Sequence, residues 1–262
     1  MLIVLKYGGN AMAALEGADP LLDDVAERVR LGDHVVLVHG GGPQIDAALA
    51  ERGIGQERVA GLRVTDAATL AVTESVLCGS VNKALVRALL RRGVRAAGVS
   101  GQDASLLVAR TAGTVEGRDL GFVGEIASVH PTVIEALLAV RLTPVVAPLG
   151  LSLDGTSALN INADTAAGAI AGALGADAYV VVTNVDRVRL RLDDPGSGIA
   201  RLTDAEARRY LADGTFDGGM RPKMESALDA LRRGARSAVI AGSGPGALTR
   251  ALAGGGTTVI RA

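Results

Sequence analysis

Short runs of apolar residues alternate along this chain with longer stretches in which apolar residues recur at helical spacing. The apolar runs have few polar interruptions, as is typical of strands that are buried on both faces of a parallel sheet. The predicted strands are Leu2–Tyr7, His34–His39, Ala96–Ser100, Thr143–Pro148, Tyr179–Asn184 and Ser237–Ala241.

The stretches between these runs predict helices over Pro20–Arg30, Pro43–Arg52, Asp66–Arg92, Pro131–Val140, Ala163–Leu174, Asp204–Leu211 and Arg221–Arg233. Asp66 and Asp204 suit N-cap positions, and Pro43 and Pro131 suit a first helical turn. The segment Leu106–Val129 instead predicts antiparallel strands, with TAGTVEGRDLG supplying the turns. The alternation of strands and helices predicts an α/β fold, a three-layer αβα sandwich with a mainly parallel central sheet.

We expect two lobes that share this sheet, with a boundary near 172–177. Residues 1–174 would form an N-terminal lobe and residues 175–262 a C-terminal lobe. The sequence has no repeat with a period of 20 to 50 residues, and no low-complexity linker divides it.

Composition narrows the class of protein. The chain is 48% hydrophobic and 21% charged with a net charge of −1, so neither a nucleic-acid nor a membrane partner is expected. Its apolar stretches are shorter than the roughly 20 residues of a membrane span, and no cleavable leader is recognised. The single cysteine, Cys78, fits a reducing cytoplasm, and the three scattered histidines show no metal-ligand spacing.

Candidate chemistry lies where the predicted parallel strands end, which is where open α/β sheets bind ligands. Lys6 comes directly before Gly8 and Gly9, and the glycines of VHGGGPQI lead from the next strand into a helix. Free N–H groups and the helix dipole at such a turn attract anions. The alternative at each position is a tight strand–helix turn that binds no ligand.

Lysine is rare here, because 24 of the 27 basic residues are arginine. A lysine supplies a compact point charge for phosphate oxygens, whereas arginine supplies a planar fork. Lys6 and Lys223, which follows the glycines of DGGMRPK, are therefore candidates for phosphate contact. The alternatives are a strand-end side chain that reaches solvent and a solvated first-turn lysine. Lys83 is interpreted as structural.

The motif NINAD places Asn160, Asn162 and Asp164 just before a helix of small residues. Asp164 could hold the two lysines in position or help to hold a metal–nucleotide complex. Alternatively, Asp164 or Asn162 could simply cap the helix. In GLRVTD, Arg63 could clamp a substrate carboxylate or could belong to a surface ion pair. Walker-type, dinucleotide-binding and serine-hydrolase motifs are not found.

The ordered set LKYGGNAM, VLVHGGGPQI, GLRVTD, GSVNKALV, NINADTAAG and DGGMRPKMESAL covers almost the whole chain. With these motifs the chain resembles the acetylglutamate kinases of the amino acid kinase superfamily. The resemblance implies the amino acid kinase fold and transfer of phosphate from ATP to the side-chain carboxylate of N-acetyl-L-glutamate, the second step of arginine biosynthesis.

The resemblance also assigns roles to residues. Lys6, Asp164 and Lys223 would be catalytic, with Asp164 holding the two ammonium groups. Arg63 would take the substrate α-carboxylate, Asn160 the N-acetylamino group, and Gly9, Gly41 and Gly42 would donate N–H groups. The ATP and phosphate contacts would be Gly8, Gly9, Asn184, Val185, Asp186, Arg187, Val188, Arg189, Gly219 and Met220. Mg²⁺ would bridge the ATP phosphates without a direct protein ligand. Asn184 and Arg187 depart from the family's common Asp and Gly.

Arginine-inhibited members of the family carry an extra N-terminal helix that joins dimers into a hexamer. Because the first strand here begins at residue 2, we expect a homodimer without arginine feedback. The nearest rival function is a kinase for aminoadipate or glutamate attached to a carrier protein, for which the arginines between Arg187 and Arg191 could offer a basic surface. A catalytically silent binding protein is a further alternative, against which the complete set of Lys6, Asp164 and Lys223 argues.

Overall fold

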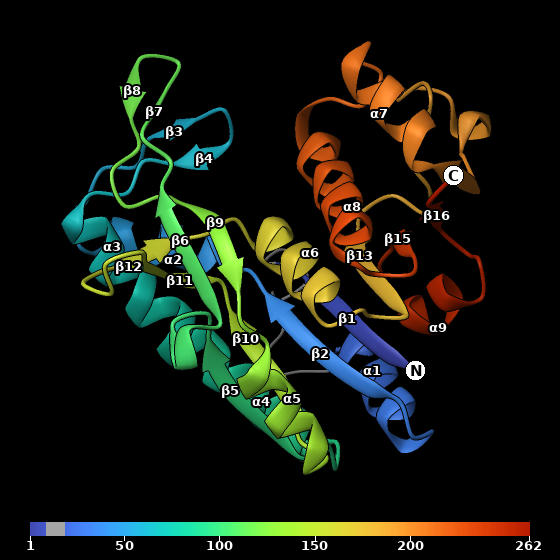
Figure 1. The fold of residues 1–262 in the computed structure, drawn as a ribbon, viewed down its shortest axis with the longest axis horizontal. Helices are drawn as coiled ribbons and strands as arrows, with labels where there is room; N and C mark the ends of the chain where they lie inside the picture. The colour runs from blue at the N-terminus through green and yellow to red at the C-terminus, as the bar shows by residue number, and fades with distance from the viewer. Residues whose placement is uncertain (9–18) are drawn as a thin grey trace.

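The computed structural model describes residues 1–8 and 19–262, and its centre is one eight-stranded sheet (Figure 1). The strand order is β14-β16-β15-β13-β1-β2-β10-β5. Strand β16 runs antiparallel to β15 and parallel to β14, whereas the remaining neighbours pair in parallel. The strands are β1 (Leu2–Tyr7), β2 (His34–His39), β5 (Ala96–Ser100), β10 (Thr143–Ala147), β13 (Ala178–Thr183), β14 (Arg201–Thr203), β15 (Ala238–Gly242) and β16 (Thr257–Ile260).

Alternating side chains of each central strand enter two separate cores. In β1, Ile3 and Leu5 belong to one core and Val4 belongs to the other. The first core also takes side chains from α1 (Pro20–Arg30), α2 (Gly42–Glu51), α3 (Ala67–Glu74), α4 (Asn82–Arg91) and α9 (Ala247–Leu252). The second takes them from α5 (Thr132–Ala139), α6 (Ala163–Ala173), α7 (Asp204–Ala212) and α8 (Arg221–Arg233). The predicted three-layer sandwich is therefore confirmed.

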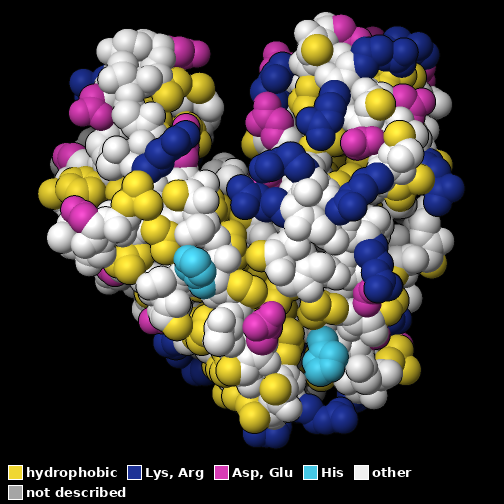
Figure 2. Space-filling view, viewed as in Figure 1, with side chains coloured by type: hydrophobic (Ala, Val, Ile, Leu, Met, Phe, Trp, Pro, Cys, Tyr) yellow, Lys and Arg dark blue, Asp and Glu magenta, His cyan; other side chains and the backbone are white. Residues whose placement is uncertain are grey.

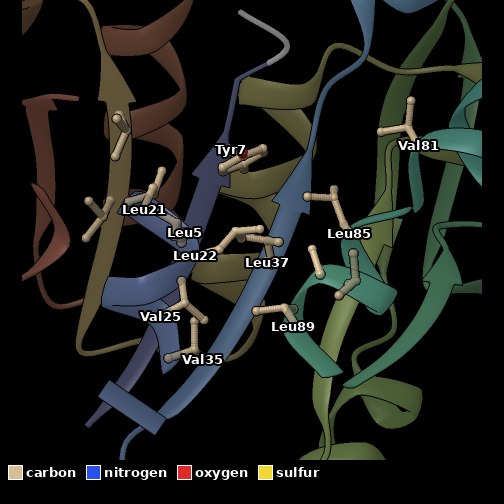
Figure 3. Close-up of a cluster of buried hydrophobic side chains, with 14 of the residues drawn as sticks. Leu5, Tyr7, Leu21, Leu22, Val25, Val35, Leu37, Val81, Leu85 and Leu89 are labelled. Atoms are coloured by element: carbon tan, nitrogen blue, oxygen red, sulfur yellow. The ribbon is translucent and has the colours of Figure 1, made fainter. Parts of the chain in front are cut away.

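Figure 3 shows part of the first core, where Leu5 and Leu37 of the sheet meet Leu22 of α1 and Leu85 of α4. Most buried side chains of the sheet are short and aliphatic, because aromatic residues make up only 2% of the chain. The fully buried Tyr7 and Tyr179 are exceptions.

A second, four-stranded sheet has the order β12-β11-β6-β9 and lies beside two short hairpins at the upper left of Figure 1. Strands β6 and β9 pair antiparallel, which confirms the antiparallel structure predicted for Leu106–Val129. The elements are β6 (Leu107–Thr111), β9 (Gly124–Val129), β11 (Leu149–Ser152) and β12 (Ala158–Asn160), with the hairpins β3 (Arg58–Val59)–β4 (Leu62–Arg63) and β7 (Thr114–Val115)–β8 (Arg118–Asp119).

The long helix predicted over Asp66–Arg92 is interrupted. A π-helix over Ser75–Val81 joins α3 to α4, and its Leu77 packs against the glycine loop that follows β2. A Cβ at Gly41 would lie 2.5 Å from Leu77 Cδ2. The amphipathic pattern predicts the helical run correctly, but it does not predict the wider turn of the π-helix.

The predicted cap and first-turn positions are confirmed at two residues and are wrong by one position at two others. The Asp66 carboxylate accepts from the Thr69 N–H, and Pro43 lies in the first turn of α2. Thr203 rather than Asp204 caps α7, because a reciprocal capping box forms with Glu206. Pro131 stands at the N-cap of α5 rather than in its first turn. The short strands β14 and β16, at one end of the strand order, were not predicted.

The expected lobe boundary falls in the turn between α6 and β13. The eight-stranded sheet takes β1, β2, β5 and β10 from before this turn and β13 to β16 from after it. Among residues 1–8 and 19–262, no helix combines the length and the apolar character needed to cross a membrane.

Candidate active site

A cavity of about 1060 Å³ opens at the carboxyl ends of β1, β2, β10, β13 and β15. The hairpin β3–β4 lines one side, and the segment between α7 and α8 lines the other. Figure 2 shows the cleft between these two parts of the molecule, with Lys and Arg side chains on both walls. The cavity is therefore placed where an open α/β sheet binds its ligand.

Lys6 and Lys223 meet at one carboxylate inside this cavity. Lys6 Nζ lies 3.0 Å from Asp164 Oδ1, and Lys223 Nζ lies 3.7 Å from Asp164 Oδ2. The exposed fraction of the side chain is only 11% for Lys6, 18% for Lys223 and 8% for Asp164. Two ammonium groups held at one buried carboxylate leave one positive charge in excess, which suits an anionic ligand.

Local structure explains why Lys6 reaches this point. Lys6 shares the face of β1 with Val4, since alternate residues of a strand point to the same side. Val4 belongs to the core that also contains α6 and α8. Lys6 is thus aimed at the helix layer that carries Asp164 and Lys223.

Asp164 is available to the lysines because another residue caps its helix. The Asn162 side chain accepts from the N–H groups of Asp164 and Thr165. In the NINAD motif, Asn162 therefore caps α6, and Asp164 pairs with the lysines.

Two glycines of α6 bring α8 and its lysine close. A Cβ at Gly168 would lie 2.5 Å from the Ser226 carbonyl oxygen, and one at Gly172 would lie 3.0 Å from the Ala230 carbonyl oxygen. The helices run in the same direction at this spacing, so their first turns lie side by side. Lys223, in the first turn of α8, is thereby set beside Asp164.

The glycine loop after β2 forms another wall of the cavity. Gly41 and Gly42 line it at the start of α2, where helix N–H groups have no partner within the helix. The fully buried His39 ring holds the Gly40–Gly41 peptide, because Nδ1 lies 2.8 Å from the Gly40 carbonyl oxygen. Burial lowers the pKa of His39 to about 4, so the ring is neutral.

Asn82 completes this support at the junction of the π-helix and α4. Its amide nitrogen lies 3.2 Å from His39 Nε2 and 2.9 Å from the Val145 carbonyl oxygen. Lys83 donates to the Asn82 side chain and to the Gly98 carbonyl oxygen, each at 3.1 Å. These contacts agree with the structural interpretation of Lys83.

Arg63 and Asn160 lie at the end of the cavity formed by β3, β4 and β12. The buried Arg63 guanidinium pairs with Asp46 of α2, and it donates to Gln56 Oε1 at 3.2 Å. The Asn160 amide donates to Thr65 Oγ1 at 3.2 Å. Arg63 is therefore in an ion pair, although its side chain is buried rather than at the surface, and it also lines the cavity. Its contact with a substrate carboxylate stays a prediction.

The opposite end of the cavity is lined by Asn184, Val185, Arg187, Val188, Arg189, Gly219 and Met220. Asp186, which the resemblance places with these residues, is not among the lining residues, and a Cβ at Gly242 would overlap its carboxylate. Gly8 lines the cavity beside the Lys6 amine, whereas Gly9 lies outside the described residues.

The cavity also contains residues that the sequence did not single out. Arg58 pairs directly across the β3–β4 hairpin with Arg63, and its guanidinium lies 3.1 Å from Asp46 Oδ1. Both φ angles of the Ala60-Gly61 turn are positive, and Gly61 was the only part of this turn that sequence could signal, since alanine is unusual at such a position. Other lining residues missed are Thr183, Phe216, Asp217 and Ser243.

No group of three or more His, Cys, Asp or Glu side chains within residues 1–8 and 19–262 is arranged to hold a metal ion. The charged centre of the cavity is the Lys6–Asp164–Lys223 cluster. Its chemistry is that of anion binding by ammonium groups and backbone N–H groups.

Residues 1–242 match the model of the amino acid kinase family. An acetylglutamate kinase of Symbiobacterium thermophilum is 44% identical over 237 residues, which cover 88% of this chain and 80% of that protein. An acetylglutamate kinase of Gluconacetobacter diazotrophicus is 46% identical over 246 residues, which cover 91% of this chain and 77% of that protein. A crystal structure from Streptococcus mutans covers 100% of this chain and 99% of its own, at 28% identity and a TM-score of 0.81. With this match added to the fold and the cavity, the chain belongs to the amino acid kinase family.

Proposed function

We propose that this protein transfers the γ-phosphoryl group of ATP to the side-chain carboxylate of N-acetyl-L-glutamate. The product is N-acetyl-L-glutamyl 5-phosphate, and the reaction is the second step of arginine biosynthesis. The observation that carries the proposal is the meeting of Lys6 and Lys223 at Asp164 inside the cavity. The names and identities of the matched acetylglutamate kinases support the choice of acceptor.

Phosphoryl transfer needs positioning and charge stabilisation more than covalent help from the protein. Lys6 contacts the group in flight, Lys223 the leaving ADP, and Asp164 keeps the two amines apart and oriented. The N–H groups of Gly41 and Gly42 add neutral donors. The acceptor carboxylate is already ionised at neutral pH, so no general base is required.

The acceptor binds at the Arg63 end of the cavity. Arg58 and Arg63 supply two positive charges there and Asp46 returns one negative charge, so one α-carboxylate balances the group. Arg63 takes that carboxylate and Asn160 holds the acetylamino group. This placement directs the side-chain carboxylate of the acceptor toward the lysines.

ATP binds at the other end, where Asn184 to Arg189 and Gly219 to Met220 follow the carboxyl end of β13 and precede α8. Mg²⁺ bound with the nucleotide would offset the negative charge of the ATP phosphates, and Lys6 and Lys223 would add positive charge beside it. In this scheme residues 1–174 bind the acyl amino acid and residues 175–262 bind ATP. Equilibrium dialysis with an ATP analogue tests the nucleotide end, because Met220→Arg should block binding there.

The geometry favours this acceptor over one attached to a carrier protein. Arg187 and Arg189 line the cavity, and Arg191 pairs with Asp194. Two of the three arginines that could have formed a docking surface for a carrier therefore face the cavity, and the third has a carboxylate partner.

An ATP-dependent hydroxamate assay tests the acceptor. Hydroxylamine traps the acyl phosphate formed from N-acetyl-L-glutamate, L-glutamate, L-aspartate or N-acetyl-L-aminoadipate. We expect kcat/KM for N-acetyl-L-glutamate to exceed that for L-glutamate by about 100-fold, because a free ammonium group would face the arginines. A preference for N-acetyl-L-aminoadipate would favour the alternative, and trapping with none of the four acceptors would refute the proposal.

The resemblance also leads us to propose a cytoplasmic homodimer, and the single cysteine agrees with a reducing compartment. A molar mass measured by light scattering tests the dimer, and a monomer at micromolar concentration would contradict it.

A further inference from the structure

A tyrosine hydroxyl lies beneath the Lys6–Asp164–Lys223 cluster, between the first turns of α6 and α8. Tyr179 is fully buried in β13, next to β1 in the sheet. Its hydroxyl lies 3.1 Å from the Asp164 carbonyl oxygen and 3.1 Å from Ser226 Oγ. One side chain of the sheet thus contacts both helices that carry the charged residues.

Ser226 extends this contact to Lys223. It is buried, and its Oγ lies 2.8 Å from the Lys223 carbonyl oxygen, one turn back in α8. A continuous path of polar contacts therefore runs from the Asp164 backbone through Tyr179 and Ser226 to the Lys223 backbone.

The two hydroxyls supply two protons for these three contacts. Tyr179 can donate to Asp164 while Ser226 donates to Lys223 or to the Tyr179 oxygen, and both hydroxyl oxygens can accept. Burial, followed by the charge of Asp164, raises the pKa of Tyr179 well above its ordinary value. The phenol therefore keeps its proton throughout the working pH range and always has a donor to offer.

The surrounding packing makes the contact specific. Gly168 lets the α8 backbone approach at Ser226, since a Cβ there would lie 2.5 Å from the Ser226 carbonyl oxygen. With the helices this close, a small slide of α8 along α6 would change the separation of Lys223 Nζ from Asp164. The hydroxyls of Tyr179 and Ser226 oppose such a slide, because they contact the backbone of the two residues, Asp164 and Lys223, whose side chains form the cluster.

We infer that Tyr179 and Ser226 are positioning residues that hold Lys223 at Asp164 by tying the first turns of α6 and α8 to the sheet. The inference rests on the proposed phosphoryl transfer, and it adds two residues that touch neither substrate. It also links the two proposed lobes, because Asp164 precedes the boundary while Tyr179 and Ser226 follow it.

Steady-state kinetics of Tyr179→Phe, Ser226→Ala and the double variant test this inference. Tyr179→Phe keeps the ring, so the core stays filled. We expect kcat to fall about tenfold, as small misplacements of a catalytic group do, while the KM values for ATP and acceptor stay within about twofold. The double variant should resemble Tyr179→Phe, because both changes break one path.

Ser237→Ala is the matched control. The Ser237 hydroxyl also donates to a backbone carbonyl, that of Asp177 at 2.9 Å, but it does so at the opposite end of the sheet. Its kcat should equal that of the wild-type protein at a temperature where circular dichroism shows all variants folded. If Tyr179→Phe does not fold, Ser226→Ala alone decides.

The inference is overturned if Tyr179→Phe and Ser226→Ala retain wild-type kcat, or if Ser237→Ala lowers kcat as much as they do. A wild-type protein without turnover would instead refute the proposed function, so the two failures are distinguishable.

Discussion

The choice of lysine at positions 6 and 223 follows from the space around Asp164. Both amines lie within 4 Å of one carboxylate that is 8% exposed, and Gly8 adds no side chain beside Lys6. A planar guanidinium would need a bidentate partner and more room. At this low exposure, charge interactions are stronger than in water, so the excess positive charge acts strongly on a phosphate.

Lys6→Ala and Lys223→Ala should each lower kcat by about 100-fold or more, because each removes a charge that stabilises the transition state. Arg63→Ala should chiefly raise the KM of the acceptor. The hydroxamate assay measures both effects.

Lys83→Ala is the control in that series, since the third lysine of the chain contacts Asn82 and a backbone carbonyl outside the cavity. Its kcat should stay within about twofold of wild type. Near-normal turnover of Lys6→Ala would remove the role assigned to Lys6.

The packing of α6 on α8 depends on residues without side chains. Gly168 and Gly172 are four residues apart and face α8 at two successive turns. Glycine weakens an isolated helix, so its presence at these two sites is explained by the close approach rather than by helix propensity.

Gly172→Ala should destabilise the protein by about 1–3 kcal/mol, because the new methyl group overpacks the contact with α8. Gly79→Ala in the π-helix is the matched change, since nothing lies within 4 Å of its Cβ position. That variant should be neutral or more stable by up to about 1 kcal/mol. Urea unfolding measures both free energies, and equal effects would contradict the packing argument.

The pattern of apolar residues predicted the buried strands and most helices. Burial determines both the short apolar runs of the strands and the helical spacing of the apolar residues. It did not predict the π-helix, since one wider turn leaves the helical pattern in place. The β3–β4 hairpin was missed because Ala60 stands at a left-handed position where Gly, Asn or Asp is the usual signal.

At the scale of the whole molecule, the two cores and the cavity meet at the carboxyl edge of the sheet. That edge explains why Lys6, the glycine loop, Asp164 and Lys223 could be predicted from sequence as one site. Tyr179 and Ser226 could not, because a tyrosine in an apolar strand and a serine in a helix carry no signal until the helices are placed. Arg58 could not be predicted as a site residue either, because its place in the cavity follows from the β3–β4 hairpin, which was missed.

The neutral, buried His39 should make the free energy of unfolding depend on pH. Its pKa is about 4 when folded and 6.5 when unfolded, so the unfolded chain binds the extra proton between these values. Stability from this group is full above pH 6.5 and is lost as the pH falls toward 4. Between pH 7 and pH 5 the loss should be about 2 kcal/mol.

Urea unfolding of the wild-type protein, His39→Gln and His130→Gln at both pH values isolates this contribution. His130→Gln serves as the control, because His130 is an exposed histidine outside both cores. The His39 variant should lose about 2 kcal/mol of that dependence, whatever its stability at pH 7. An unchanged slope in His39→Gln would contradict the assignment.

The central place of β1 has a consequence for synthesis of the chain. β1 lies between β2 and β13, and Ile3 pairs with Ala178. A ribosome must therefore make more than 170 further residues before β1 gains its second neighbour, and α8 emerges later still. Until then the amine of Lys6 has no partner amine from α8, so the cluster at Asp164 is complete only after α8 has been made. Pairings this distant also slow folding, which leaves a nascent chain exposed for longer to chaperones and proteases.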